Sequence, residues 1–169
     1  MILFIVGPPA AGKTSVARHL IEPLSKRVQK PKWTVGKSLV AAGHYMGEMF
    51  DGSDQVQYDG VPEALEFWSV ALQGYKTTLI DGDRFANSKV LQYFIARKAQ
   101  CKCVHITAPP NILADRRKQR GSTQATHWLL GKATKSERFA DMFSDTLHLL
   151  SDRPSAHMAQ KVMEFAGIK

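Results

Sequence analysis

The sequence predicts an α/β fold in three layers, with helices on both faces of a mainly parallel sheet. An apolar run at residues 2–6 is followed at once by a glycine-rich turn and an amphipathic helix. Further along, segments typical of strands alternate with segments typical of helices, and strands connected in this way pair in parallel. The length of 169 residues predicts a single domain, 1–169.

The first helix is expected to end near Ser25, because its apolar positions recur at helical spacing up to that point. These positions are Val16, Ala17, Leu20, Ile21 and Leu24. A basic connector containing Pro31 follows, since the residue before a proline resists helix. The β-branched residues and glycines of 33–45 predict a strand or hairpin, and the turn residues of 50–60 predict a loop.

In the second half, Pro62 is expected to open a helix that Gly74 closes. An arginine-rich segment follows Pro109 and Pro110 and is expected to form a lid, approximately 109–135. The remaining elements are expected at 75–80 (strand), 87–98 (helix), 103–107 (strand), near 136–149 (helix) and 155–165 (helix).

The composition indicates a globular domain of the cytoplasm. Hydrophobic residues make up 44% of the chain and charged residues 22%, which is ordinary for folded domains. No apolar run approaches the roughly 20 residues of a membrane span, and the apolar start lacks the basic leader of a signal peptide. The two cysteines, Cys101 and Cys103, are expected to be packed core thiols, since a zinc site would need other ligands.

Residues 7–14 read Gly-Pro-Pro-Ala-Ala-Gly-Lys-Thr, the Walker A pattern, between a strand and a helix. In a P-loop NTPase fold this loop wraps a triphosphate, because its backbone N–H groups converge on the phosphate oxygens. Lys13 is expected to contact the β- and γ-phosphates of ATP, and the Thr14 hydroxyl to bind Mg²⁺. The alternative is a glycine turn that matches the pattern by chance. The expected ATP-binding residues are Gly7, Pro8, Ala10, Ala11, Gly12, Lys13, Thr14 and Ser15.

The chain carries excess positive charge, with 23 Lys and Arg against 15 Asp and Glu and a formal net charge of +8. A small-nucleotide kinase needs only a few cations in its site, so this excess favours a polyanionic partner such as DNA. A basic surface that serves solubility is the alternative. The cluster expected to bind nucleic acid is Lys26, Arg27, Lys30, Lys32 and Lys37. A second basic cluster comprises Arg116, Arg117, Lys118, Arg120, Lys132, Lys135 and Arg138.

The sequence Asp81-Gly82-Asp83-Arg84 directly follows an apolar strand. P-loop folds place carboxylates near Mg²⁺ at such a strand end, directly or through water, and both Asp81 and Asp83 are candidates. Arg84 is expected to hold a transferring or accepting phosphate. The alternative is an Asp-Gly turn in which Asp83 caps the next helix.

A second acidic segment, Asp51-Gly52-Ser53-Asp54, lies in a loop bracketed by glycines. Phosphoryl transfer to a hydroxyl needs a carboxylate that orients the hydroxyl and takes its proton, and Asp54 is the candidate. A solvated turn is the alternative interpretation. The nearby aromatic residues that are expected to stack on a base are Tyr45, Phe50 and Tyr58.

Arg116 and Arg120, and likewise Arg117 and Arg120, are spaced to share one face of a helix in the lid segment. In small phosphotransferases such a lid closes over the γ-phosphate, stabilises charge in the transition state and excludes water. A solvated basic helix surface is the alternative.

The phosphate loop and the arginine lid resemble those of the nucleoside monophosphate kinase superfamily. Further blocks resemble bacteriophage P-loop kinases, a group that includes the 5-hydroxymethyluracil DNA kinases of thymine hypermodification. These blocks are Gly-x-Tyr-x-Gly…Gly-Ser-Asp in 43–54, Asp81-Gly82-Asp83-Arg84-Phe85, Arg120-Gly121-Ser122-x-Gln124 and Gly131-Lys132-x-Thr134-Lys135. The resemblance covers most of the chain in order, and it implies transfer of the ATP γ-phosphate to the hydroxymethyl group of a modified pyrimidine in DNA. It assigns the catalytic roles to Lys13, Asp54, Asp83, Arg84, Arg116 and Arg120.

Two other functions stay open. One is a kinase for a free deoxynucleotide or nucleoside, such as a pyrimidine monophosphate. The other is an NTP-dependent switch or a nucleic-acid-binding NTPase, which is disfavoured because no Asp-Glu pair at a strand end is present to activate water.

Overall fold

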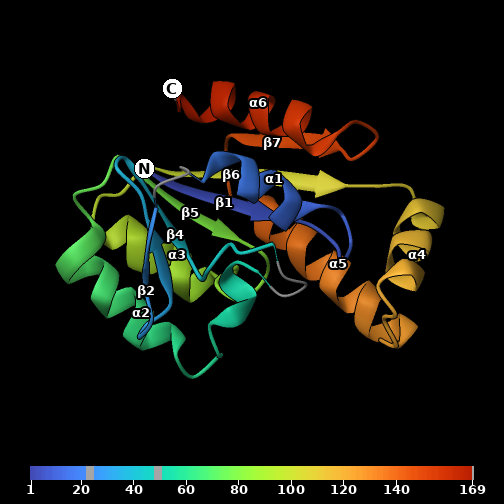
Figure 1. Cartoon of the computed structure of the whole chain (residues 1–169), viewed down its shortest axis with the longest axis horizontal. Coiled ribbons are helices and arrows are strands. Elements are labelled where there is room, and N and C mark those ends of the chain that lie inside the picture. Colours follow the sequence, from blue (N-terminus) through green and yellow to red (C-terminus); the bar gives the residue numbers. More distant parts are fainter. Residues whose placement is uncertain (22–24, 48–50, 169) are drawn as a thin grey trace.

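The computed structural model describes residues 1–21, 25–47 and 51–168. Within these residues the chain forms one seven-stranded sheet between two layers of helices (Figure 1). The strands are β1 (Ile2–Val6), β2 (Lys26–Val28), β3 (Trp33–Val35), β4 (Leu39–Ala42), β5 (Thr77–Asp81), β6 (Cys101–Thr107) and β7 (Thr146–Leu150). Their order in the sheet is β2-β3-β4-β5-β1-β6-β7. The predicted three-layer α/β/α fold is confirmed.

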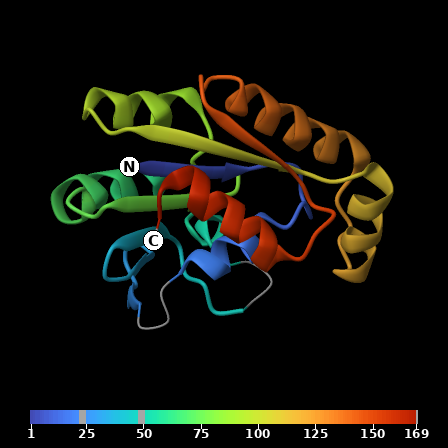
Figure 2. The ribbon, with the colours of Figure 1, turned by 90° about the horizontal axis from the view of Figure 1, so that it is seen from above.

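Helices cover both faces of the sheet. They are α1 (Lys13–Leu20), α2 (Val61–Phe67), α3 (Ser88–Ala96), α4 (Pro110–Gln119), α5 (Thr126–Ala140) and α6 (Ser155–Ala166), with a 3₁₀ turn η1 (Ser53–Gln55) and a π-helical segment η2 (Trp68–Leu72). Figure 2 shows α1 and α6 on one side of the sheet and α3 and α5 on the other. Among the described helices, none has the length and apolar character that crossing a membrane requires.

The central strand β1 is buried on both faces, as its continuous apolar run predicts. Leu3 and Ile5 pack in the core that lies beneath α1 and α6. Phe4 points to the opposite face, where its ring meets Phe94 of α3 and Phe139 of α5 edge to face. Two apolar cores, one on each side of the sheet, therefore hold the layers together.

Strands β4, β5, β1, β6 and β7 run parallel, whereas β2 and β3 are antiparallel to their neighbours. The carboxyl ends of the parallel strands therefore share one edge of the sheet. The glycine loop after β1, the 43–54 segment after β4, the acidic turn after β5 and the lid after β6 all begin at this edge. The lid, formed by α4 and the start of α5, projects beyond it (Figure 1).

Three sequence predictions need correction. Helix α1 ends at Leu20, before Ser25, because Ile21 is already extended; Leu24 lies outside the described residues. The basic connector is in part strand β2, which is the outermost strand of the sheet and pairs with β3. The segment expected as a helix near 136–149 instead holds the end of α5 and strand β7, because pairing with β6 outweighs the helix-compatible leucines of 146–150.

Candidate functional site

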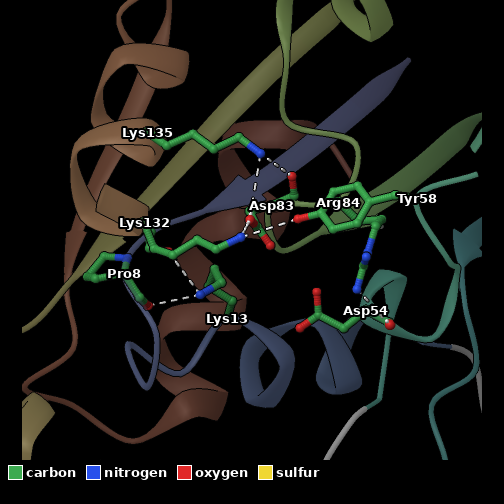
Figure 3. Close-up of polar contacts among 9 residues, drawn as sticks. Pro8, Lys13, Asp54, Tyr58, Asp83, Arg84, Lys132 and Lys135 are labelled. Atoms are coloured by element: carbon green, nitrogen blue, oxygen red, sulfur yellow. Dashed lines mark hydrogen bonds and ion pairs between the residues drawn. The ribbon is translucent and has the colours of Figure 1, made fainter. Parts of the chain in front are cut away.

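The glycine loop joins β1 to α1 in the geometry that its sequence predicts. Gly7 has a φ of 151°, and a Cβ there would collide with the carbonyl oxygen of Ile106 in β6, so only glycine fits. Gly12 has a φ of 92° and forms the N-terminal cap of α1. The ammonium of Lys13 lies across the loop and donates to the carbonyl oxygens of Gly7 at 3.0 Å and Pro8 at 2.9 Å (Figure 3). Burial lowers the pKa of Lys13, against the charges of Asp54 and Asp81, which raise it.

Asp81 is the acidic residue that contacts the end of the loop. The Thr14 hydroxyl donates to Asp81 Oδ2 at 2.8 Å. Asp81 is the last residue of β5, and strand alternation puts its side chain on the same face as Leu79, which packs in the core beneath α1. Burial raises the pKa of Asp81, and hydrogen bonds from Tyr45, Ser53 and Thr14 counteract part of this shift. A hydroxyl and a carboxylate at this distance are oxygen donors of the kind that Mg²⁺ prefers.

The segment after β4 surrounds Asp81. The Tyr45 hydroxyl donates to Asp81 Oδ1 at 2.7 Å, and the Ser53 backbone N–H donates to the same oxygen at 3.1 Å. The Ser53 hydroxyl also donates to the Asp81 carbonyl oxygen. A Cβ at Gly52 would collide with the Asp81 carboxylate, so this approach needs a glycine. Tyr45, Gly52 and Ser53 therefore position Asp81, a role that the turn-like sequence did not indicate.

Asp51 holds the same segment against α1. Its Oδ2 accepts hydrogen bonds from the backbone N–H groups of Met46 at 2.9 Å and Gly47 at 2.8 Å, and pairs with the Arg18 guanidinium at 2.8 Å. The Asp51 side chain is fully buried. Because Arg18 and Asp51 both line the cavity described below, this ion pair forms part of its wall.

Asp54 lies beside Gly82 with its side chain exposed towards the cavity. Partial desolvation by the cavity walls raises the pKa of Asp54, and the negative charges of Asp81 and Asp83 raise it further, while Lys13 and Arg84 oppose the shift. Within the described residues, no hydrogen bond or ion pair reaches the Asp54 carboxylate, in contrast to Asp51, Asp81 and Asp83. Asp54 is thus accessible to a ligand.

Asp83 and Asp81 occupy different environments. Gly82, with a φ of 87°, turns the chain after β5, and Asp83 then meets two lysines of α5. Lys132 forms a short ion pair with Asp83 Oδ2, and Lys135 lies 3.6 Å from the same oxygen (Figure 3). Partial burial raises the pKa of Asp83, but the hydrogen bond and charge of Lys132, followed by the charge of Lys135, lower it more. The cap of α3 is Asn87 and not Asp83.

Arg84 lies over the ring of Tyr58, with its Cζ 3.9 Å from the ring centroid. Its Nη2 donates to the backbone carbonyl of Asp54 at 3.3 Å (Figure 3). The phosphate-binding role predicted for Arg84 stays a prediction.

The predicted stacking residues differ in their surroundings. The Tyr45 hydroxyl is bound to Asp81, and one face of Tyr58 is covered by Arg84. Phe50 lies outside the described residues.

The two predicted lid arginines point to different places. Arg116 donates to the Ser151 hydroxyl at 2.9 Å and to the Ser151 carbonyl at 3.1 Å, and also reaches the Ala10 carbonyl at 3.4 Å. Arg116 therefore joins the lid to the outer side of the glycine loop. Arg120 lines the cavity together with Arg117, which the sequence analysis did not assign to the site.

A cavity of about 610 Å³ lies where these segments meet. The glycine loop and Thr14 form one wall, and Asp54, Gly82 and Asp83 form the adjacent one. The lid contributes the third wall, which comprises Arg117, Arg120, the 121–124 turn, Trp128 and Lys132. The cavity therefore brings the glycine loop together with carboxylates and several cations.

The five basic residues predicted to bind nucleic acid are exposed, but they do not form one compact patch. Lys30 and Lys32 lie in the turn between β2 and β3, at the sheet edge that holds the glycine loop, because Trp33 pairs with Ala42 at the end of β4. Arg27 contacts Met46 through its Nη1. Lys37 lies in the turn between β3 and β4, at the opposite edge, and Lys26 pairs with Val35 towards that edge.

Cys101 and Cys103 are free thiols, and burial raises the pKa of Cys101 to about 11 and that of Cys103 to about 12. In the three described ranges of the chain, no cluster of three or more His, Cys, Asp or Glu side chains is arranged to hold a metal ion.

Sequence reasoning missed Lys132 and Lys135 as site residues, although it recognised them as basic. Their spacing of three was a usable signal, because residues three apart share a helix face. The predicted start of the helix at Ser136 concealed it, since α5 begins at Thr126. Trp128 was missed for the same reason.

The chain matches one protein family model over residues 3–140, and the family is described as AAA domain. Among curated protein sequences, none is significantly similar to this chain.

Several solved structures are similar in fold. The tunicamycin resistance protein of Deinococcus radiodurans has a TM-score of 0.61 at 16% identity, over 99% of this chain and 96% of that chain. YorR of Bacillus subtilis, solved with phosphorylated GDP, has a TM-score of 0.63 at 14% identity, over 99% and 96%. The APS kinase CysC of Mycobacterium tuberculosis, solved with AMPPNP and APS, has a TM-score of 0.51 at 15% identity, over 98% and 96%. At these identities the likeness shows a shared fold alone.

Proposed function

This chain belongs to the AAA domain family, and on that premise we propose that it is an ATP-dependent phosphotransferase with a hydroxyl acceptor. One observation carries the proposal. The glycine loop, the lid arginines and the accessible carboxylate of Asp54 line a single cavity, and the Thr14–Asp81 pair adjoins it. A donor phosphate on the loop and an acceptor beside Asp54 would thus meet in one cavity.

Thr14 and Asp81 are the residues that fit Mg²⁺, either directly or through water. Bound there with ATP, Mg²⁺ would neutralise charge on the β- and γ-phosphate oxygens. Tyr45 and Ser53 fix the Asp81 carboxylate through its other oxygen, so Oδ2 stays directed at Thr14.

Asp54 acts as the acceptor base in this proposal. The acceptor hydroxyl gives its proton to the Asp54 carboxylate while its oxygen forms a bond to the γ-phosphorus. The bond between that phosphorus and the β–γ bridging oxygen breaks, and ADP leaves with the bonding electrons. Lys13, Arg117 and Arg120 stabilise the negative charge of the transferring group. The raised pKa of Asp54 makes it a better proton acceptor than an ordinary aspartate.

The acceptor that we propose is the hydroxymethyl group of 5-hydroxymethyluracil in phage DNA, in a step of thymine hypermodification. The resemblance to the phage kinase group and the net charge of +8 support this acceptor. A duplex base must be flipped out to enter a cavity, at a cost of a few kcal/mol. Lys30 and Lys32 lie at the same edge of the sheet as the glycine loop. Contacts of their ammonium groups with the DNA backbone phosphates would offset that cost.

A kinase for a free deoxynucleotide or nucleoside is the second candidate. Two observations favour it: the basic cluster is divided between the two edges of the sheet, and the cavity of about 610 Å³ has the size of a small-ligand site.

An acceptor screen with γ-labelled ATP tests the proposal. The protein should label DNA that contains 5-hydroxymethyluracil and leave thymine DNA, free nucleosides and free nucleotides unlabelled. Label on a free nucleoside or nucleotide alone would establish the second candidate. ATP hydrolysis at full rate without any acceptor would instead indicate an NTPase. Lys13→Ala should abolish transfer to every acceptor, which excludes a contaminating kinase.

A further inference from the structure

We propose that Trp128 is the platform on which a planar heteroaromatic acceptor ring stacks, so that the acceptor class is a nucleobase rather than a sugar. This inference rests on the proposed phosphotransferase function and assigns its acceptor subsite to the first turn of α5. Trp128 is the third residue of that helix and lines the cavity.

The exposure of Trp128 distinguishes it from the two other tryptophans of the chain. Trp33 is 0% exposed and Trp68 is 3% exposed, and both belong to the apolar core. Trp128 is 39% exposed. A large apolar side chain that is left open in the wall of a cavity is a feature of ligand sites, because covering it with a ligand removes its apolar surface from water.

Contacts made by Lys132 place Trp128 on the acceptor side of the cavity. Lys132 lies one helical turn after Trp128, with its ammonium 5.0 Å from the Trp128 ring centroid. The same ammonium binds Asp83 and lies 3.2 Å from the Tyr58 hydroxyl. Asp83 follows Gly82, against which the Asp54 carboxylate rests. The ring of Trp128 is thereby connected to the neighbourhood of the acceptor base.

Arg116 makes its contacts elsewhere. It donates to Ala10 and Ser151, and neither Trp128 nor Lys132 takes part in these contacts. An acceptor ring on Trp128 would thus lie apart from the Arg116 contact and beside Lys132 and Asp83.

The polar groups around Trp128 also suit a nucleobase. Lys132 supplies an ammonium donor over the indole ring, 5.0 Å from its centroid, and the lid turn adds Ser122, Thr123 and Gln124 to the wall. Such side chains can hydrogen-bond the carbonyl and N–H groups on the edge of a base while its face stacks on the indole.

Intrinsic fluorescence tests this subsite without relying on catalysis. Acrylamide should quench mainly Trp128 in the free protein, because Trp33 and Trp68 are buried. With ADP present, 5-hydroxymethyl-2′-deoxyuridine, or a single-stranded oligonucleotide that contains this base, should quench the emission and protect it from acrylamide. Ribose should do neither. Comparing the affinities of the oligonucleotide and the free nucleoside shows whether the base binds more tightly in DNA or as a free nucleoside.

Three variants make the test specific. Trp128→Leu should abolish ligand-induced quenching and weaken the affinity of the ring ligand, measured by calorimetry, at least about fivefold, the loss expected for one stacking contact. Trp128→Phe should restore affinity to within about threefold, because a phenyl ring also stacks. Leu130→Ala, at an exposed position of the same helix, should behave as the parent protein.

Equal affinity of the Leu and Phe variants would overturn the inference, and so would the absence of quenching by every pyrimidine and purine nucleoside or oligonucleotide tried. Quenching by a non-hydrolysable ATP analogue alone would overturn it too, by assigning the indole to the donor base. If ring ligands bind Trp128 as expected but no acceptor is labelled by ATP, the proposed phosphotransfer fails while the subsite stands.

Discussion

The Thr14 hydroxyl donates a hydrogen bond to Asp81 Oδ2 at 2.8 Å and so joins the start of α1 to the end of β5. The two residues are 67 positions apart in the chain. Their contact defines the oxygen donors that are available to Mg²⁺ beside the glycine loop.

Replacing Asp81 with Asn should raise the Mg²⁺ concentration needed for half-maximal phosphate transfer. The amide keeps the size of the carboxylate but lacks its negative charge, and losses of about tenfold or more are expected at such positions. Initial rates across a magnesium titration measure the effect. Asp59→Asn, at an exposed position, is the control and should match the parent protein. An unchanged magnesium titration for Asp81→Asn would contradict the assignment.

Tyr45→Phe should move the acid limb of the pH–rate profile to higher pH. The Tyr45 hydroxyl donates to Asp81 and lowers the pKa of that carboxyl, so its removal raises this pKa further. Asp81 would then become protonated at a higher pH and lose its charge there. Rates should fall most at mildly acidic pH and recover towards pH 8. Tyr75→Phe removes a hydroxyl elsewhere and should leave the profile as it was; a parallel loss at all pH values in Tyr45→Phe would disprove the mechanism.

Asp54→Asn should slow phosphate transfer by about 10²–10⁴-fold, the range for loss of a general base. The affinity for an ATP analogue should change little, since the contacts with the loop are unaffected. In the parent protein, protonation of Asp54 should lower the rate at a higher pH than protonation of an ordinary aspartate would, because the pKa of Asp54 is raised. Single-turnover rates and calorimetry separate the two effects. A variant that transfers phosphate at the parental rate would remove Asp54 from the mechanism.

The ion pair between Asp83 and Lys132 should make the stability of the fold depend on pH. The pKa of Asp83 is lower in the folded than in the unfolded chain. Its contribution is therefore present above the unfolded value of about 3.9 and is lost as the pH falls through the lower folded value. Asp83→Asn should lower the free energy of unfolding by about 1 kcal/mol at pH 7 and by a smaller amount near pH 3, which lies below the unfolded value.

Urea unfolding at the two pH values measures this difference. Asp115→Asn, at an exposed position of α4, serves as the control. An equal loss of stability in Asp83→Asn at both pH values would show that the carboxylate charge does not matter.

If DNA is the acceptor, removing the charges of Lys30 and Lys32 should weaken DNA binding. The slope of the logarithm of the binding constant against the logarithm of the salt concentration should also become shallower by about one for each lost phosphate contact. Lys37→Ala should have a much smaller effect, because Lys37 lies at the opposite edge of the sheet. Binding of a labelled oligonucleotide across a salt series provides the measurement. Equal effects of Lys37→Ala and of the changes at Lys30 and Lys32 would argue against this surface.

Local sequence patterns predicted most of the fold. The apolar run of β1, the glycine loop and the helix that follows are contiguous, so a short window contains all the information they need. The prediction of a helix over the residues of β7 was wrong. The leucines of this segment suit a helix equally well, and only pairing with the neighbouring strand β6 selects the extended form. The start of α5, at Thr126, was placed too late, near Ser136, because the residues before it were assigned to the lid.

The sequence by itself determined the donor half of the site. The positions of Lys13 and Thr14 follow from the spacing of one loop, which has few conformations. Only the tertiary structure shows which of Asp81 and Asp83 contacts Thr14. Strand alternation directs Asp81 towards Thr14, whereas the left-handed turn at Gly82 directs Asp83 to the lysines of α5. That choice depends on packing between β5 and two helices far away in the chain, and no local pattern encodes it.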